Sequence, residues 1–229
     1  MEISAFKRQV AQDWAGDDTA AAWQKHFPQM REQMAAVTNA LVEAAQPQPG
    51  MRILDLASGN GEPALSLARR VAPNGYVTAT DLNEGMLSAL RANAAADPVM
   101  NIETKVCDAH QLPFADGSFD LVTSRFGVMF FADTPAALRE IKRVLKSGGR
   151  VAFLVWGPPG PARTLGQRHC PLCGDSPSNR ILTVQARCVS QSRASSQSCS
   201  RTLDSRMLRN AAQIFPLLTV DHLRICSRP

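Results

Sequence analysis

The sequence predicts an α/β fold: a Rossmann-like, doubly wound and mostly parallel sheet, preceded by an N-terminal helical arm. Two observations carry this prediction. Between residues 51 and 157, short apolar segments of strand character alternate with segments in which apolar residues recur at helical spacing. Glycines and carboxylates follow directly after several strand segments, where sheets of this kind bind their ligands. With 229 residues, of which 45% are hydrophobic, the chain can bury one sizeable core.

The predicted sheet begins at residues 52–56 (RILDL), an apolar run that leads into a glycine-containing turn. Pro63 suits the first turn of the next helix, because a missing N–H has no cost there. That helix is indicated by four apolar residues at i, i+3, i+4 and i+7 spacing, which are Ala64, Leu67, Ala68 and Val71. The alternation then repeats, with strands predicted at 76–80, 101–106, 119–123 and 151–156 and helices at 84–96 and 134–146.

Residues 1–50 are predicted to be a helical arm or lid. Helical composition extends over residues 4–46, and we expect it to be broken near residues 16–18 and at Pro28. The run Gln46-Pro47-Gln48-Pro49-Gly50 ends the arm as a linker. The core then covers residues 51–157.

Residues 158–229 have a different composition. They contain ten Arg, three Asp and no Lys or Glu, a net charge of +7, whereas residues 1–157 contain 15 Lys and Arg against 17 Asp and Glu, a net charge of −2. No sustained periodicity is visible over residues 158–205, so we expect the sheet to lack its last strands and residues 151–156 to be an exposed apolar edge. We interpret this tail as disordered or as an altered, possibly frameshifted, reading.

The net positive charge and the cysteine count would suggest a nucleic-acid or metal partner, but only for the tail. The net charge of +5 and the pI near 9.1 come entirely from it, so contact with RNA or another polyanion is expected only there. A non-catalytic protein with such a tail is the alternative function. His169, Cys170 and Cys173 resemble half of a zinc knuckle, but the other cysteines stand singly and no metal is expected.

A membrane protein is not expected. The longest apolar run, residues 126–132, is far below the roughly 20 residues that a helix needs to cross a bilayer. The first ten residues, MEISAFKRQV, lack the apolar region of a secretory signal. We therefore predict a cytoplasmic protein.

The first candidate ligand motif is the turn from Asp55 to Gly61. Gly59 and Gly61 permit a close backbone approach, and the helix that follows favours an anionic group at its N-terminus. The spacing from Gly59 to Ala64 also fits G-x-G-x-x-A, a dinucleotide-binding pattern. Asp55 opposes that alternative, because a carboxylate facing the ligand suits an ammonium group better than a pyrophosphate.

Two further acids follow the next two strands. Asp81 lies 20 residues after Gly61, the spacing at which a carboxylate accepts from two ribose hydroxyls. Asp81 could instead cap the following helix, although Asn83 is an equally good cap. Asp108 follows the third strand, where it could accept from an exocyclic amine or be a solvated loop acid. Three acids at the ends of three successive strands are a specific signal for a ligand site, although each acid alone is a weak one.

Four segments resemble the class I S-adenosylmethionine-dependent methyltransferases, and within them the branch of the ubiquinone/menaquinone biosynthesis C-methyltransferases: RILDLASGNGEPALSLARRV, ATDLNEGML, CDAHQLPFADGSFDLVTSRFGVMFF and LREIKRVLKSGGRVAFLVWGP. The resemblance covers about residues 45–158. Members of this family usually continue with a helix and an antiparallel strand pair, which are not recognisable after Pro159. The resemblance implies an enzyme that loses its activity if this C-terminal region is lost.

The resemblance implies S-adenosylmethionine as the cofactor and a role for nine residues. Asp55 and the backbone of Ala57, Gly59 and Gly61 would hold its methionine end. The ribose and adenine would contact Asp81, Met86, Asp108 and Ala109. Arg125 would either meet the cofactor carboxylate or form a surface ion pair.

The implied reaction is an in-line displacement at the sulfonium methyl, carried mainly by positioning, with a small-molecule acceptor that the sequence does not identify. A carbon acceptor would need a base. His110 follows the adenine contacts and is expected to support that loop, and His26 of the arm is expected to be a surface residue.

Overall fold

The computed structural model describes residues 17–96, 101–156, 163–169 and 180–186, together with Ala5, Gln9 and Trp14. Residues 17–19, 156, 163–169 and 180–186 are described by their backbone alone. The elements in chain order are α2 (Asp17–Gln33), α3 (Ala35–Ala45), β1 (Arg52–Leu56), α4 (Ala64–Val71), β2 (Tyr76–Asp81), α5 (Glu84–Ala95), β3 (Ile102–Val106), β4 (Phe119–Arg125), the 3₁₀ helix η1 (Val128–Phe130), α6 (Thr134–Val144), β5 (Leu145–Trp156), β6 (Arg163–His169) and β7 (Arg180–Ala186).

One sheet with the strand order β3-β2-β1-β4-β5-β7-β6 organises the molecule. The first five strands in this order are parallel. The chain therefore winds from β1 outward to β3 and then back across to β4 and β5, as the predicted doubly wound fold requires. In this register Asp55 lies between Ala79 of β2 and Thr123 of β4.

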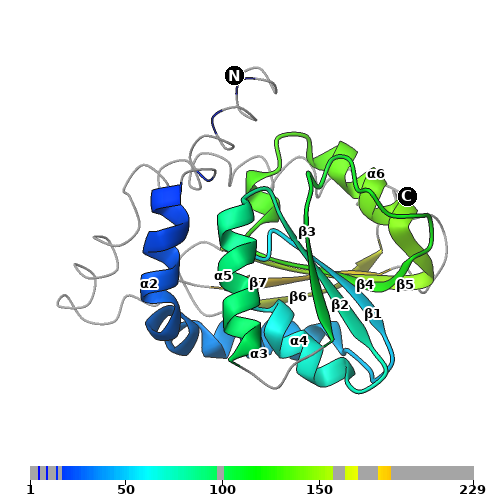
Figure 1. The fold of residues 1–229 in the computed structure, drawn as a ribbon. Helices are drawn as coiled ribbons and strands as arrows, with labels where there is room; N and C mark the ends of the chain where they lie inside the picture. Colours follow the sequence, from blue (N-terminus) through cyan, green and yellow to red (C-terminus); the bar gives the residue numbers. More distant parts are fainter. Residues whose placement is uncertain are drawn as a thin grey trace.

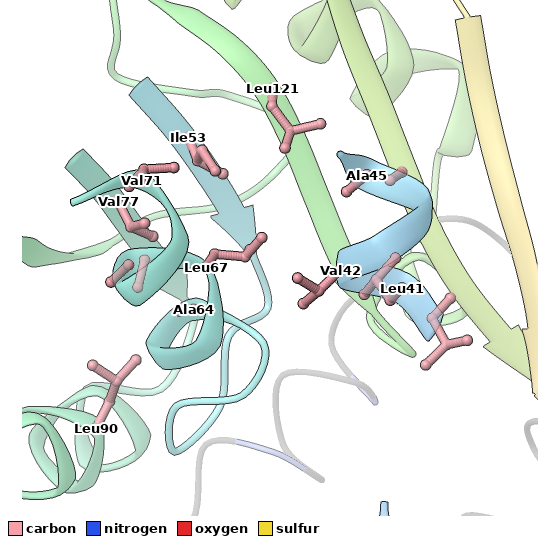
Figure 2. Packing of buried hydrophobic residues seen from close by; sticks show 14 of the residues in the cluster. Leu41, Val42, Ala45, Ile53, Ala64, Leu67, Val71, Val77, Leu90 and Leu121 are labelled. Carbon is pink, nitrogen blue, oxygen red and sulfur yellow. The ribbon is translucent and has the colours of Figure 1, made fainter. Parts of the chain in front are cut away.

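Helices cover both faces of the sheet (Figure 1). One face packs against α3, α4 and α5, and Figure 2 shows side chains of α3 and α4 gathered over Ile53 and Leu121 of the sheet. The other face packs against α6 and the segment before β4, through a second cluster that includes Leu54, Val122 and Ile141. Ile53 and Leu54 are both buried, but on opposite faces of the sheet, because successive side chains of a strand point to opposite faces.

The arm differs from the prediction at Pro28. The chain remains helical from Asp17 to Gln33 with Pro28 inside α2, whereas a proline was expected to break the helix. Tertiary packing outweighs the lost backbone hydrogen bond, because Phe27 is buried against Leu65 and Ala94. In Figure 1, α2 stands alongside α5, and the side chains of Gln24 and Asn93 are hydrogen-bonded at 3.0 Å.

The expectation of a sheet without its last strands is wrong in this structure. The backbone of β7 pairs in parallel with β5, and β6 pairs antiparallel with β7. The segment RILTVQA contains β-branched and other apolar residues, and a strand on the edge of β5 satisfies the N–H and C=O groups that would otherwise stay unpaired. The segment was missed because it stands alone in a stretch without recurring strand and helix patterns. The rest of the predicted tail, including Cys170 and Cys173, lies outside the described residues.

The end of α6 also differs slightly from the prediction. The helix ends at Val144 and β5 begins at Leu145, whereas a helix to residue 146 and a strand from residue 151 were expected. The β4–β5 register shifts between Phe119 and Leu121, which absorbs the glycine-containing segment as an irregularity within the strand. None of the helices in the described part of the chain combines the length and the apolar composition that a bilayer crossing requires.

Candidate functional site

Asp55 is a fully buried carboxylate on β1, with 0% of its surface exposed. Thr123 of β4 donates a hydrogen bond from Oγ1 to Asp55 Oδ1 at 2.6 Å. The second carboxylate oxygen, Oδ2, has no hydrogen-bond partner among the described residues. Burial raises the pKa of Asp55 to about 7, although the bond from Thr123 and the charge of Arg125 oppose this rise. The site thus contains a buried oxygen that lacks a donor, which native structures rarely tolerate without a ligand or water.

The turn after β1 has the close backbone packing that its glycines predicted. Gly61 has φ +136°, where an L side chain is strained, and a Cβ there would also approach Leu65 Cδ1 to 2.7 Å, so the backbone favours glycine. A Cβ on Gly59 would meet nothing within 4 Å, so there is open space beside this residue. The N–H of Gly59 donates to Asp81 Oδ2 at 2.9 Å. The turn is therefore fixed to the end of β2 while one side of it remains accessible.

Asp81 occupies the predicted place at the end of β2 and does not cap the next helix. Asn83 is the N-cap of α5, since its Oδ1 accepts from the N–H of Gly85 at 2.7 Å. Asp81 instead accepts from the N–H groups of Gly59 and Asn83, at 2.9 and 3.0 Å. Burial raises the pKa of Asp81, and these backbone bonds oppose the rise. The carboxylate is oriented by two fixed donors and keeps lone pairs for a ligand.

Asp108 and His110 form a structured turn after β3. The N–H of His110 donates to Asp108 Oδ1 at 2.9 Å, and His110 Nδ1 contacts the same oxygen. His110 Nε2 accepts from the N–H of Asp133 at 3.1 Å. An acceptor Nε2 requires that Nδ1 carries the proton, so both ring nitrogens are engaged. The expectation that His110 supports this loop agrees with these contacts.

Arg125 contacts the arm from the end of β4. Its guanidinium donates to Thr38 Oγ1 of α3 at 2.9 Å. Burial lowers the pKa of Arg125, while the carboxylates of Glu62 and Asp55 act in the opposite direction. The residue is therefore a part-buried link between sheet and arm, and the alternative of a surface ion pair does not describe it.

The remaining predicted residues have different environments. Met86 is 2% exposed on α5, and Ala109 is half-buried against the cluster that includes Leu54 and Val122. Leu82, which follows Asp81, was not predicted and is 48% exposed. An exposed leucine beside a ligand-type carboxylate is an apolar contact surface at the same edge of the sheet.

Sequence reasoning also missed Glu62 and Asn60, which lie in the glycine-containing turn. Glu62 is 4% exposed, forms an ion pair with Arg31 Nε of α2 at 3.0 Å and accepts from Ser66 Oγ at 2.6 Å. Asn60 Nδ2 donates to the carbonyl of Trp23 at 3.1 Å. Their signal in the sequence is only that they are polar residues between glycines and a helix. Their partners on α2, Arg31 and Trp23, are about 30 to 40 residues away and depend on the fold.

The alternatives for metal and polyanion binding gain no support here. Within the described segments, no group of three or more His, Cys, Asp or Glu residues is arranged to hold a metal ion. Most of the basic tail, with the half zinc knuckle, falls beyond those segments, so binding of RNA by the tail stays a prediction.

Comparison with known proteins identifies the class. Residues 54–153 match a protein-family model described as a methyltransferase domain. This segment holds most of the parallel sheet, with the glycine-containing turn and the three acids. A structure from Methanococcus maripaludis, assigned to the S-adenosyl-L-methionine-dependent methyltransferases, superposes with a TM-score of 0.55 at 25% identity, over 62% of this chain and 64% of that chain. Residues 54–153 therefore form a methyltransferase domain, and the described fold is similar to that of a protein assigned to the S-adenosylmethionine-dependent methyltransferases.

Within the class, the chain is similar to ubiquinone/menaquinone biosynthesis C-methyltransferases named UbiE. The protein from Cupriavidus taiwanensis is 38% identical over 153 residues, which are 61% of each chain. That from Stenotrophomonas maltophilia is 46% identical over 114 residues, 49% of this chain and 45% of the relative. The chain thus spans less than two thirds of the length of these curated relatives. This similarity favours S-adenosylmethionine over a dinucleotide as the ligand expected at the Gly59–Ala64 turn.

Proposed function

We propose that this chain binds S-adenosylmethionine and transfers its methyl group to a small-molecule acceptor. The observation that carries the proposal is the buried Asp55 Oδ2, which lacks a donor at the carboxyl end of β1. An unsatisfied buried carboxylate oxygen costs on the order of 1–3 kcal/mol or more. An ammonium group, directly or through one water, would supply the missing donor, whereas a phosphate would not.

The other predicted residues fit the remaining parts of such a cofactor. Asp81 has two carboxylate oxygens held by backbone donors and suits a ribose diol. Leu82 offers exposed apolar surface for the adenine, with Asp108 and Ala109 at the next strand end. Open space beside Gly59 lets the ligand approach the backbone closely. Met86 is assigned to the adenine region only through α5, because its side chain is nearly covered.

When bound, the cofactor supplies a methyl group that its sulfonium already activates. The residues of this chain then have to bind, orient and exclude water. His110 is not a candidate base, since both of its ring nitrogens are engaged. Asp55, Asp81 and the turn between them serve binding, so the proposed mechanism is one of positioning.

The arm, residues 1–50, is proposed to be the lid of this site. Side chains from the turns that follow β1 and β2 and from the end of β4 hold it. Asn60 and Asn83 donate to the carbonyls of Trp23 and Trp14, and Arg125 donates to Thr38. Trp14 also packs edge-on against Phe130 of η1, with ring centroids 5.5 Å apart. The residues that hold the arm alternate along the chain with those assigned to the cofactor, so both would order the same turns.

Calorimetric titration of the full chain with S-adenosylhomocysteine tests the proposal. The wild type should bind, and Asp81→Ala should weaken binding by about tenfold to a hundredfold, the loss of hydrogen bonds to a charged group. Asp116→Ala is the matched control, since that carboxylate is 80% exposed and belongs to the segment before β4. It should leave the affinity unchanged. Absence of binding at millimolar ligand would refute the proposal. The cytoplasmic location and the identity of the acceptor remain predictions that this experiment does not address.

A further inference from the structure

Two positions near the mouth of the proposed cofactor site carry amino acids that their backbones do not favour. Ala57, directly after β1, has φ +53°, a conformation that glycine adopts more readily. Gly127, two residues after β4, has φ −75° and ψ −41°, which any residue adopts. Conformation alone would place glycine at position 57 and allow alanine at position 127.

Space explains this reversal. A Cβ built on Gly127 would lie 2.4 Å from Ala57 Cβ, well inside van der Waals contact. It would also lie 2.7 Å from Ser124 Oγ and 3.4 Å from the carbonyl oxygen of Leu56. The space between the two turns therefore holds one methyl group, and Ala57 supplies it at the expense of a strained backbone.

The contact joins two turns that are also linked by a hydrogen bond. Ser124 Oγ donates to the carbonyl oxygen of Leu56 at 2.9 Å, and both residues are buried. The turn after β4 contains a second residue with positive φ, Phe126 at +65°. Non-glycine residues in this region persist only where the surroundings determine them, and they concentrate at functional sites. Here two of them follow adjacent strands at the ligand edge of the sheet.

We propose that Ala57 and Gly127 form a positioning pair that fixes the separation of the turns after β1 and β4 and so pre-organises the backbone of residues 57–59 toward the cofactor. The inference rests on the proposed function, because it concerns the same site. Ala57 acts through the turn that carries Gly59, whose N–H is bound to Asp81. Replacing Ala57 with glycine relieves strain but also releases the turn, so the ligand must pay for ordering it.

The experiment compares wild type, Ala57→Gly, Gly127→Ala and the double variant, by calorimetric titration with S-adenosylhomocysteine and by thermal unfolding. Ala57→Gly should melt no lower than the wild type, yet bind about two- to fivefold more weakly, the equivalent of ~0.4–1 kcal/mol of chain entropy. A purely structural residue would not lose affinity without losing stability. Gly127→Ala should lower both the melting temperature and the affinity. Its loss of affinity should be at least about threefold smaller in the Ala57→Gly background than in the wild type.

Gly117→Ala provides the strain control. Gly117 has φ +63°, a Cβ there would come no closer than 3.9 Å to Lys146 Cα, and it precedes β4 at the opposite end of the sheet. This variant should lose stability and keep its affinity.

Additive effects of the two substitutions, or an unchanged affinity in Ala57→Gly, would overturn the pair while wild-type binding still supported the proposed function. A wild type that does not bind would overturn both. If Gly127→Ala fails to fold, a double variant that folds still supports the pair. A Cβ at position 127 also lies 2.7 Å from Ser124 Oγ, so if the double variant fails as well, the affinity of Ala57→Gly decides, and an unchanged affinity overturns the pair.

Discussion

The two ends of the parallel sheet treat their carboxylates in opposite ways. At the carboxyl end, burial raises the pKa of Asp55 and of Asp81, and one oxygen of Asp55 has no donor in the described structure. At the amino end, burial would raise the pKa of Asp120, but bonds from Lys146 Nζ and the N–H of Arg52, at 2.8 and 2.9 Å, hold it below its usual range. Paired carboxylates stabilise the fold, whereas incompletely paired ones are available to a ligand.

Glu140 and Arg143 extend the stabilising pattern. A bidentate contact with Arg143 lowers the pKa of Glu140, and Arg143 also donates to the carbonyls of Leu112 and Phe114, at 2.8 and 2.7 Å. One guanidinium thus satisfies the backbone of the segment that precedes β4. Charged side chains at the amino end of the sheet thus stabilise the fold, whereas those at the carboxyl end are available to bind a ligand.

The largest expected effect concerns Asp55 and pH. Because its folded-state pKa of about 7 lies above the ordinary 3.8, the folded protein holds this proton more tightly than the unfolded chain. The free energy of unfolding should therefore fall as pH rises from about 4 to about 7 and level off above. Between pH 5 and pH 8 this group should remove about 2–3 kcal/mol, at 1.36 kcal/mol per pH unit. Asp55→Asn should abolish that loss.

Chemical denaturation of wild type and Asp55→Asn at several pH values measures this difference. Asp120→Asn is the comparison at the other end of the sheet. With a lowered pKa, Asp120 contributes stability above its unfolded value, and that contribution disappears as the pH falls toward and below it. The two variants should differ from the wild type with opposite dependence on pH. Parallel profiles would contradict the contrast between the two ends.

A smaller effect is expected from Arg143→Ala. Loss of two carbonyl bonds and of the pair with Glu140 should reduce the free energy of unfolding by about 1–2 kcal/mol, because the side chain is partly solvated. Affinity for S-adenosylhomocysteine should be unchanged, since none of the partners of Arg143 is among the residues assigned to the cofactor. Urea unfolding and calorimetry on the same samples separate the two quantities. A loss of affinity comparable to that of Asp81→Ala would show that the ends of the sheet are not independent.

The sequence predicted most of what local pattern determines. The predicted bounds of β1 agree with the structure, and the three acids lie in or just after the last residues of β1, β2 and β3, the strands with which they were expected. Asn83 is the helix cap that left Asp81 available for a ligand. These features follow from strand period, turn residues and capping, which act over a few positions.

Contacts between distant residues could not be predicted in the same way. Thr123 meets Asp55 across 68 positions, and Thr38 meets Arg125 across 87. Neither residue type nor spacing indicates such pairs before the strand order is known. Pro28 and β7 show the same limit, because packing on α5 and pairing with β5 outweigh a local preference.

The smallest expected effect tests whether the arm serves ligand binding or only stabilises the fold. The side chain of Arg31 is 42% exposed and that of its partner Glu62 is 3% exposed. The pair therefore joins an exposed cation to a buried carboxylate in the cofactor turn. Arg31→Ala should cost about 0.5–1 kcal/mol of unfolding free energy, because Glu62 keeps its bond from Ser66. If the arm is a lid, S-adenosylhomocysteine should also dissociate faster from this variant, which stopped-flow displacement measures. Lys142→Ala, an exposed cation on α6, is the control. Equal dissociation rates for the two variants would assign the arm to the stabilising part of the molecule.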